Sequence, residues 1–167
     1  FTGGPDTARH IVRGSAENLA STSLELGGKS PFVVFEDADL ESAANAQVSG
    51  IFAASGQSCV AGSRLVVAAS VKEAFLAKLK AKAEAVIIGA PDDMATEVGP
   101  LCTAAQVARA EDIIARSLEA GATLVTGGTR LEGAGHYFPP TILDCSAAPD
   151  APCLIEEFFG PVLSAVS

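Results

Sequence analysis

Short apolar runs alternate with helical repeats along the whole chain, and no other feature of the sequence restricts its fold as much. The apolar runs at 32–35, 64–68 and 123–126 have the length and the valine-containing composition of buried strands. Between them, apolar residues recur every three or four positions, as on one face of an amphipathic helix. This alternation predicts an α/β fold with a parallel or mixed sheet.

The helical repeats predict four main helices, which span residues 6–19, 40–52, 71–86 and 103–120. The last of them has an apolar face that we expect to be buried, formed by Val107, Ile113, Ile114 and Leu118. Asp37 or Asp39 is suited to cap the second helix, because an aspartate side chain accepts a hydrogen bond from the first helical turn.

The length and the two ends of the chain indicate one sizeable core that draws on further sequence. At 167 residues and 49% hydrophobic content, the chain is long enough for one domain. It begins with Phe1 rather than Met, and residues 161–167 stop inside an apolar strand-like run. We therefore expect both ends to be interior to a longer protein, so that a complete active site needs residues from outside this stretch.

Charge and composition narrow the classes of partner. The formal net charge is −9, and the 11 basic residues are scattered, so nucleic acid is not an expected partner. No apolar run approaches the ~20 residues of a membrane-spanning helix, so no membrane partner is expected. His10 and His136 lie far apart without a ligand pattern, so no metal site is expected.

The four cysteines show no paired spacing and do not belong to a short disulfide-rich chain. Reduced thiols in a cytoplasmic protein are the better interpretation. We expect three of them to be packing residues, namely Cys102, Cys145 and Cys153.

Cys59 differs from the other cysteines because it lies in a glycine-bounded loop, 56–59, that interrupts the second helix. Main-chain N–H groups near such a thiol lower its pKa from about 8.5 and stabilise a developing oxyanion. A buried, unreactive cysteine is the alternative, and the loop alone does not decide between the two.

Four motifs, in order along the chain, together resemble those of the aldehyde dehydrogenase superfamily. They are FTGG at 1–4, LELGGKSP at 24–31, GQSC at 56–59 followed by AGSR at 61–64, and EEFFGPV at 156–162. Any one of them is a weak signal, particularly the glycine-rich FTGG. Their shared order and spacing make the combination specific.

The resemblance implies an α/β fold in which residues 1–26 end a Rossmann-like cofactor domain and residues 27–167 form most of a truncated, thiol-bearing catalytic domain. It implies NAD(P)-dependent oxidation of a small aldehyde. Cys59 would attack the aldehyde carbon to give a thiohemiacetal, which becomes a thioester as hydride leaves. Glu25 would then activate the water that hydrolyses this thioester. On composition alone, a solvated turn residue would be the favoured interpretation of Glu25, and the motif reverses that preference.

The same resemblance implies contacts with the cofactor, which is NAD or NADP. Gly3 and Gly4 would lie where a strand feeds a helix N-terminus, and Leu26 would offer its main chain beside the nicotinamide. Glu157 would hold the nicotinamide ribose, and Phe159 would flank the ring. Gly4 stands where a serine is usual in the family, so one hydroxyl contact is lost.

Two alternatives remain open. A cysteine hydrolase would pair Cys59 with His136 or His10, although nothing around either histidine resembles a hydrolase signature. The other alternative is that this polypeptide lacks most of the cofactor domain, has no activity and serves only as a packing or oligomerisation module. The family resemblance also implies a homodimer or homotetramer for the full-length enzyme.

Overall fold

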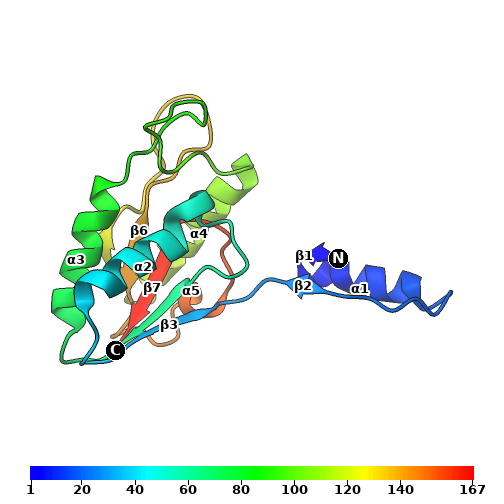
Figure 1. Cartoon of the computed structure of the whole chain (residues 1–167), viewed down its shortest axis with the longest axis horizontal. Coiled ribbons are helices and arrows are strands. Elements are labelled where there is room, and N and C mark those ends of the chain that lie inside the picture. Colours follow the sequence, from blue (N-terminus) through cyan, green and yellow to red (C-terminus); the bar gives the residue numbers. More distant parts are fainter.

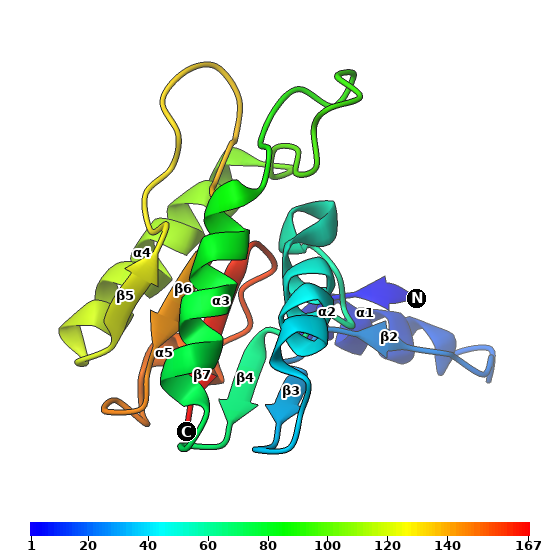
Figure 2. The same ribbon diagram turned by 60° about the vertical axis from the view of Figure 1, so that its left-hand side comes forward.

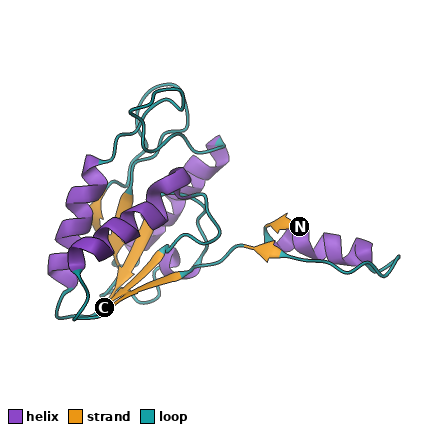
Figure 3. Ribbon diagram, viewed as in Figure 1, coloured by secondary structure: helices purple, strands orange, loops and turns teal.

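The strands form two separate sheets in this computed structural model, which describes residues 1–167 (Figure 1). In the small sheet, β1 (Thr2–Gly3) pairs in parallel with β2 (Glu25–Leu26), and α1 (Pro5–Ser15) connects them. This N-terminal segment extends to one side of the rest of the chain, as the colouring by secondary structure also shows (Figure 3).

The larger sheet has five strands in the order β3-β4-β7-β6-β5. Its strands are β3 (Pro31–Val34), β4 (Arg64–Val67), β5 (Thr123–Thr126), β6 (Thr141–Asp144) and β7 (Val162–Val166). All neighbours are parallel except β5 and β6, which are antiparallel. The prediction of an α/β fold with a parallel or mixed sheet is therefore confirmed.

Helices cover both faces of this sheet, with α2 (Leu40–Phe52) and α3 (Lys72–Ala85) on one face and α4 (Ala104–Glu119) and the short α5 (Pro152–Ile155) on the other (Figure 2). Successive strand residues point to opposite faces. Ile142 accordingly packs with α2 and α3, whereas its neighbour Leu143 packs in the second core with α4 and α5. The short apolar runs are thus strands buried between two helical layers.

The helices α2 and α4 each begin after a residue whose side chain caps the first turn. Asp39 caps α2, since its side chain accepts a hydrogen bond from the main-chain N–H of Ser42 at 2.8 Å. Thr103 caps α4 in the same way, because its side chain accepts a hydrogen bond from the main-chain N–H of Gln106. Of the two aspartates predicted to cap α2, Asp39 is the one that does so.

The first helix is shorter than predicted, because α1 ends at Ser15 rather than at residue 19. Leu19 is 90% exposed and has a φ of 57°, outside the helical range. Only Ala8 of this helix is buried. The last predicted turn therefore lacks the packing that stabilises most protein helices.

Leu118 is not buried on the apolar face of α4, contrary to the prediction, and its side chain is exposed. Ser117 takes the inward position instead. Its Oγ donates to the carbonyl of Ile113 at 2.6 Å and accepts from the main-chain N–H of Cys153 at 3.0 Å. A buried polar group is tolerated here because both of its hydrogen bonds are made.

No helix of the structure combines the length and the apolar character that a membrane crossing requires.

Candidate functional site

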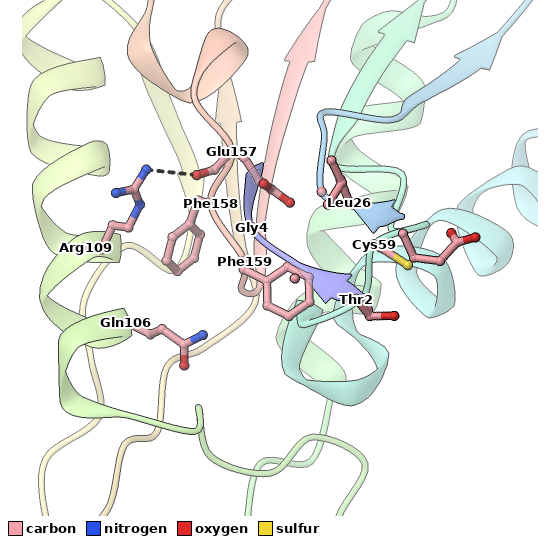
Figure 4. A pocket seen from close by; sticks show the side chains of 12 residues that line it. Thr2, Gly4, Leu26, Cys59, Gln106, Arg109, Glu157, Phe158 and Phe159 are labelled. Atoms are coloured by element: carbon pink, nitrogen blue, oxygen red, sulfur yellow. Dashed lines mark hydrogen bonds between the residues drawn. The ribbon is translucent and has the colours of Figure 1, made fainter. Parts of the chain in front are cut away.

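A cleft of about 360 Å³ lies where the N-terminal segment meets the larger α/β unit (Figure 4). β1, β2 and the residues next to them form one side of it, and the loop after α2 brings Cys59 to it. α4 and the segment after α5 complete the lining. Residues far apart in the sequence therefore share one cavity.

Cys59 reaches this cleft because α2 stops abruptly at Phe52, which is fully buried. The next residues, Ala53–Gly56, form a tight turn, and the chain then emerges as an exposed loop. The Cys59 thiol is exposed and lines the cleft. Its main-chain N–H makes no hydrogen bond, so it is available to a ligand atom beside the sulfur.

Glu25 lines the same cleft from strand β2. Its main-chain N–H donates to the carbonyl of Phe1 at 2.9 Å, which extends the pairing of β1 with β2. The Glu25 carboxylate makes no salt bridge and no hydrogen bond within the chain. Glu25 and Cys59 therefore line one cavity, although they lie 34 positions apart in the sequence.

The five residues predicted to contact a cofactor also line this cleft, namely Gly3, Gly4, Leu26, Glu157 and Phe159. A Cβ atom at Gly4 would meet nothing within 4 Å, so no steric reason prevents the serine that is usual there. Phe159 is 37% exposed, which leaves its ring available to a flat partner.

Glu157 is fixed by contacts with the glycines after β2. The main-chain N–H of Gly28 donates to Glu157 Oε1 at 3.0 Å, while Oε2 makes no hydrogen bond. A Cβ atom at Gly27 would collide with the Glu157 carboxylate, so this glycine makes the approach possible. One carboxylate oxygen is therefore held by the protein and the other is free to accept a hydroxyl.

Two polar residues of α4, Gln106 and Arg109, line the cleft and were missed in the sequence analysis. Figure 4 shows them across the cavity from Cys59, with Phe159 between. Arg109 Nη2 also donates to the carbonyl of Glu157 at 3.2 Å. Their three-residue spacing places them on one helix face, but a polar helix face is usually solvated, so this spacing alone does not indicate a site.

The remaining cysteines divide into two groups. Cys145 and Cys153 are buried, with their sulfurs 3.3 Å apart, which confirms the prediction that they pack in the core. The same prediction is wrong for Cys102, which is exposed and hydrogen-bonded to Gln57.

Neither histidine lines the cleft that contains Cys59. No group of three or more histidine, cysteine or acidic side chains is close enough together to hold a metal ion. The charged side chains among the residues that line the cleft with Cys59 are therefore those of Glu25, Glu157 and Arg109, and no imidazole is among them.

The turn before Cys59 makes Gly56 much less replaceable than Gly50 in α2. Gly56 has a φ of 69°, and a Cβ atom there would collide with the main chain of Gly160 and Pro161. We expect Gly56→Ala to lower the free energy of unfolding by at least about 2 kcal/mol. A Cβ at Gly50 would meet nothing within 4 Å, so Gly50→Ala should raise stability by about 0.5–1 kcal/mol. Urea unfolding of both variants checks this, and equal effects would contradict the predicted contrast.

Arg116 of α4 holds Glu156, the neighbour of Glu157, through two hydrogen bonds of 2.7 and 3.0 Å. These bonds keep the pKa of Glu156 below its usual 4.5. The folded carboxylate then binds its proton at a lower pH than the unfolded one. The ion pair therefore stabilises the fold above pH 4.5, and this contribution is lost as the pH falls below that value.

Because both side chains are partly exposed, we expect the pair to contribute at most about 1 kcal/mol. Glu156→Gln should make the melting temperature less sensitive to pH between about pH 7 and about pH 3. The matched control is Glu132→Gln, at an exposed carboxylate before β6. An identical pH dependence of the melting temperature in wild type and Glu156→Gln would show that the ion pair between Arg116 and Glu156 does not stabilise the fold.

The whole chain is similar to proteins of known activity. The sequence model of the aldehyde dehydrogenase family matches residues 1–167. The (Z)-2-((N-methylformamido)methylene)-5-hydroxybutyrolactone dehydrogenase of Acinetobacter baylyi is 60% identical over 164 residues, which are 98% of this chain and 34% of that protein. The betaine aldehyde dehydrogenase of Rhizobium leguminosarum is 41% identical over 167 residues, with the same shares of 98% and 34%. The chain thus spans about a third of the length of the curated relatives it matches.

Solved structures of dehydrogenases superimpose closely on this chain. The NAD+ complex of aldehyde dehydrogenase from Bacillus cereus superimposes with a TM-score of 0.94 at 39% identity, covering 99% of this chain and 34% of that one. A 3,6-anhydro-L-galactose dehydrogenase in complex with NAP gives a TM-score of 0.93 at 39% identity, covering 99% of this chain and 35% of the other.

Proposed function

Since the chain belongs to the aldehyde dehydrogenase family, we propose that the enzyme that carries it oxidises an aldehyde to a carboxylic acid with NAD+ or NADP+. Cys59 is the nucleophile and Glu25 the general base. The observation that carries this proposal is that Cys59 and Glu25 line one cleft together with Glu157 and Phe159.

Cys59 forms the covalent intermediates. Its thiolate adds to the carbonyl carbon of the aldehyde and gives a tetrahedral thiohemiacetal. The free main-chain N–H of Cys59 is suited to donate to the oxygen that becomes negatively charged. A dinucleotide bound in the cleft would supply the hydride acceptor, and Cys59 would then carry the oxidised substrate as a thioester.

Glu25 acts on the thioester. Its carboxylate has no ion-pair or hydrogen-bond partner within the chain, and it accepts a proton from a water molecule, which then attacks the thioester carbon. The products are a carboxylic acid and a free Cys59 thiol. Base catalysis of this kind commonly contributes about 10² to 10⁴ in rate.

The cleft has groups that fit the nicotinamide end of such a cofactor. Glu157 Oε2 is free to accept from ribose hydroxyls, and the exposed ring of Phe159 offers a flat apolar wall. Arg109 provides a cation for a phosphate, and Gln106 provides an amide. Gly3 and Gly4 precede α1 and leave the start of this helix open to an anionic or polar group.

We further propose the domain division at residue 26. Residues 1–26 would complete the cofactor domain, and residues 27–167 would form most of the catalytic domain. In support, β1 and β2 belong to one sheet and all later strands to another.

For the assembled enzyme, we propose a homodimer or homotetramer in the cytoplasm. Val33 and Phe35, at the edge strand β3 and just after it, are 52% and 68% exposed, and self-association would cover such apolar side chains. Four free cysteines fit a reducing compartment.

A cofactor titration followed by an activity assay tests the proposal. NAD+ or NADP+ should raise the melting temperature of the purified enzyme, and small aldehydes, betaine aldehyde among them, should yield one NAD(P)H per acid formed. Ester or amide hydrolysis without any need for a dinucleotide would favour the cysteine hydrolase instead. A protein with neither cofactor binding nor turnover would favour the inactive packing module.

A further inference from the structure

The loop that leads into Cys59 follows a left-handed path. Ala54, Ser55 and Gly56 have φ values of 51°, 55° and 69°. For residues other than glycine this conformation costs ~1–2 kcal/mol each, and it persists only where surrounding contacts hold it. The contacts of this loop therefore determine where the thiol lies.

Two side chains of the loop bind the same segment of the chain, residues 99–102. Ser55 Oγ donates to the carbonyl oxygen of Gly99 at 2.8 Å. The Gln57 amide forms a reciprocal pair with Cys102, since its Oε1 accepts from the main-chain N–H at 3.0 Å and its Nε2 donates to Sγ at 3.0 Å. Gln57 is thus the last side chain before Cys59 that anchors the loop.

Residues 99–102 lead directly into α4, which carries Gln106 and Arg109 into the cleft. On this geometry we propose that Gln57 is a positioning residue, which fixes the position of Cys59 relative to the residues of α4 that line the cleft. The inference rests on the proposed role of Cys59. Gln57 itself is not among the residues that line the cleft.

Because Gln57 acts through Cys59, its loss should slow the chemical step without weakening binding. A displacement of about 1 Å at reacting atoms costs ~10²-fold in rate. We expect Gln57→Leu to lower kcat about 10²-fold, with the KM values for aldehyde and NAD(P)+ changed less than about twofold. A role in folding alone would lower the melting temperature and leave kcat per folded molecule unchanged.

Three variants of the enzyme separate these roles. Gln57→Leu removes both hydrogen bonds to Cys102. Gln57→Glu keeps the acceptor for the main-chain N–H and should restore kcat to within about tenfold of wild type. The matched control, Cys102→Ala, removes only the sulfur and should stay within about threefold. For each variant, kcat, KM, melting temperature and the alkylation rate of Cys59 by iodoacetamide are measured, the last by peptide mass spectrometry.

Unchanged kcat together with an unchanged alkylation rate of Cys59 in Gln57→Leu would overturn the proposal, as would a rise in KM alone. If Gln57→Leu does not fold, Gln57→Asn decides, because its shorter side chain cannot span to Cys102 and should show the same fall in kcat. If Gln57→Asn does not fold either, Gln57 serves folding and the proposal is wrong. Failure of the proposed function is distinguishable, since it appears as full activity in Cys59→Ala.

Discussion

Cys59→Ser is expected to lower kcat/KM for aldehyde oxidation by at least about 10³-fold. A serine hydroxyl would occupy nearly the same place in the cleft, but it stays protonated near neutral pH and is a far weaker nucleophile than a thiolate. The fold should be unaffected, because Cys59 is exposed. Initial rates of NAD(P)H formation give the measurement.

Cys102→Ser is the matched control for this variant, since Cys102 is the other exposed cysteine. It should retain activity within about threefold of wild type. If Cys59→Ser kept more than about a tenth of the activity, another group would have to carry out the attack on the aldehyde.

Glu25→Gln is expected to slow turnover by about 10² to 10³-fold while the first turnover still occurs. Glutamine occupies the same volume but cannot accept a proton from water. The thioester on Cys59 would therefore form and then accumulate. Stopped-flow measurement should show a burst of NAD(P)H close to one per active site, followed by a slow phase.

Glu17→Gln, at an exposed carboxylate beyond the end of α1, is the control and should behave as wild type. Loss of the burst in Glu25→Gln would instead assign Glu25 to a step before hydride transfer, such as deprotonation of the thiol. Wild-type turnover without a burst would leave Glu25 as a solvated turn residue.

The alternation of apolar runs and helical repeats was sufficient to predict the α/β fold. Strand residues such as Ile142 and Leu143 are both apolar because helices cover both faces of the sheet, and this produces the continuous runs seen in the sequence. Leu118 shows the limit of such patterns. Ser117 is buried in its place because a partner across the core, the N–H of Cys153, satisfies its hydroxyl, and no pattern within one helix contains that information.

The site was predictable only in part, for a similar reason. The motifs indicated Cys59, Glu25 and Glu157, and the structure brings these three residues to one cleft. Arg109 was not predicted, since its position depends on how α4 packs against the segment after α5. The left-handed turn at Ala54 was equally hidden, because alanine gives no sign of a positive φ.

Identification of the covalent intermediate shows directly whether Cys59 is the nucleophile. Glu25→Gln enzyme is mixed with an aldehyde and NAD(P)+, quenched in acid, digested and analysed by mass spectrometry. We predict an acyl group of the mass of the oxidised aldehyde on the peptide that contains Cys59. Oxidation of the aldehyde without an acyl group on Cys59, or with the acyl group on another residue, would contradict the account.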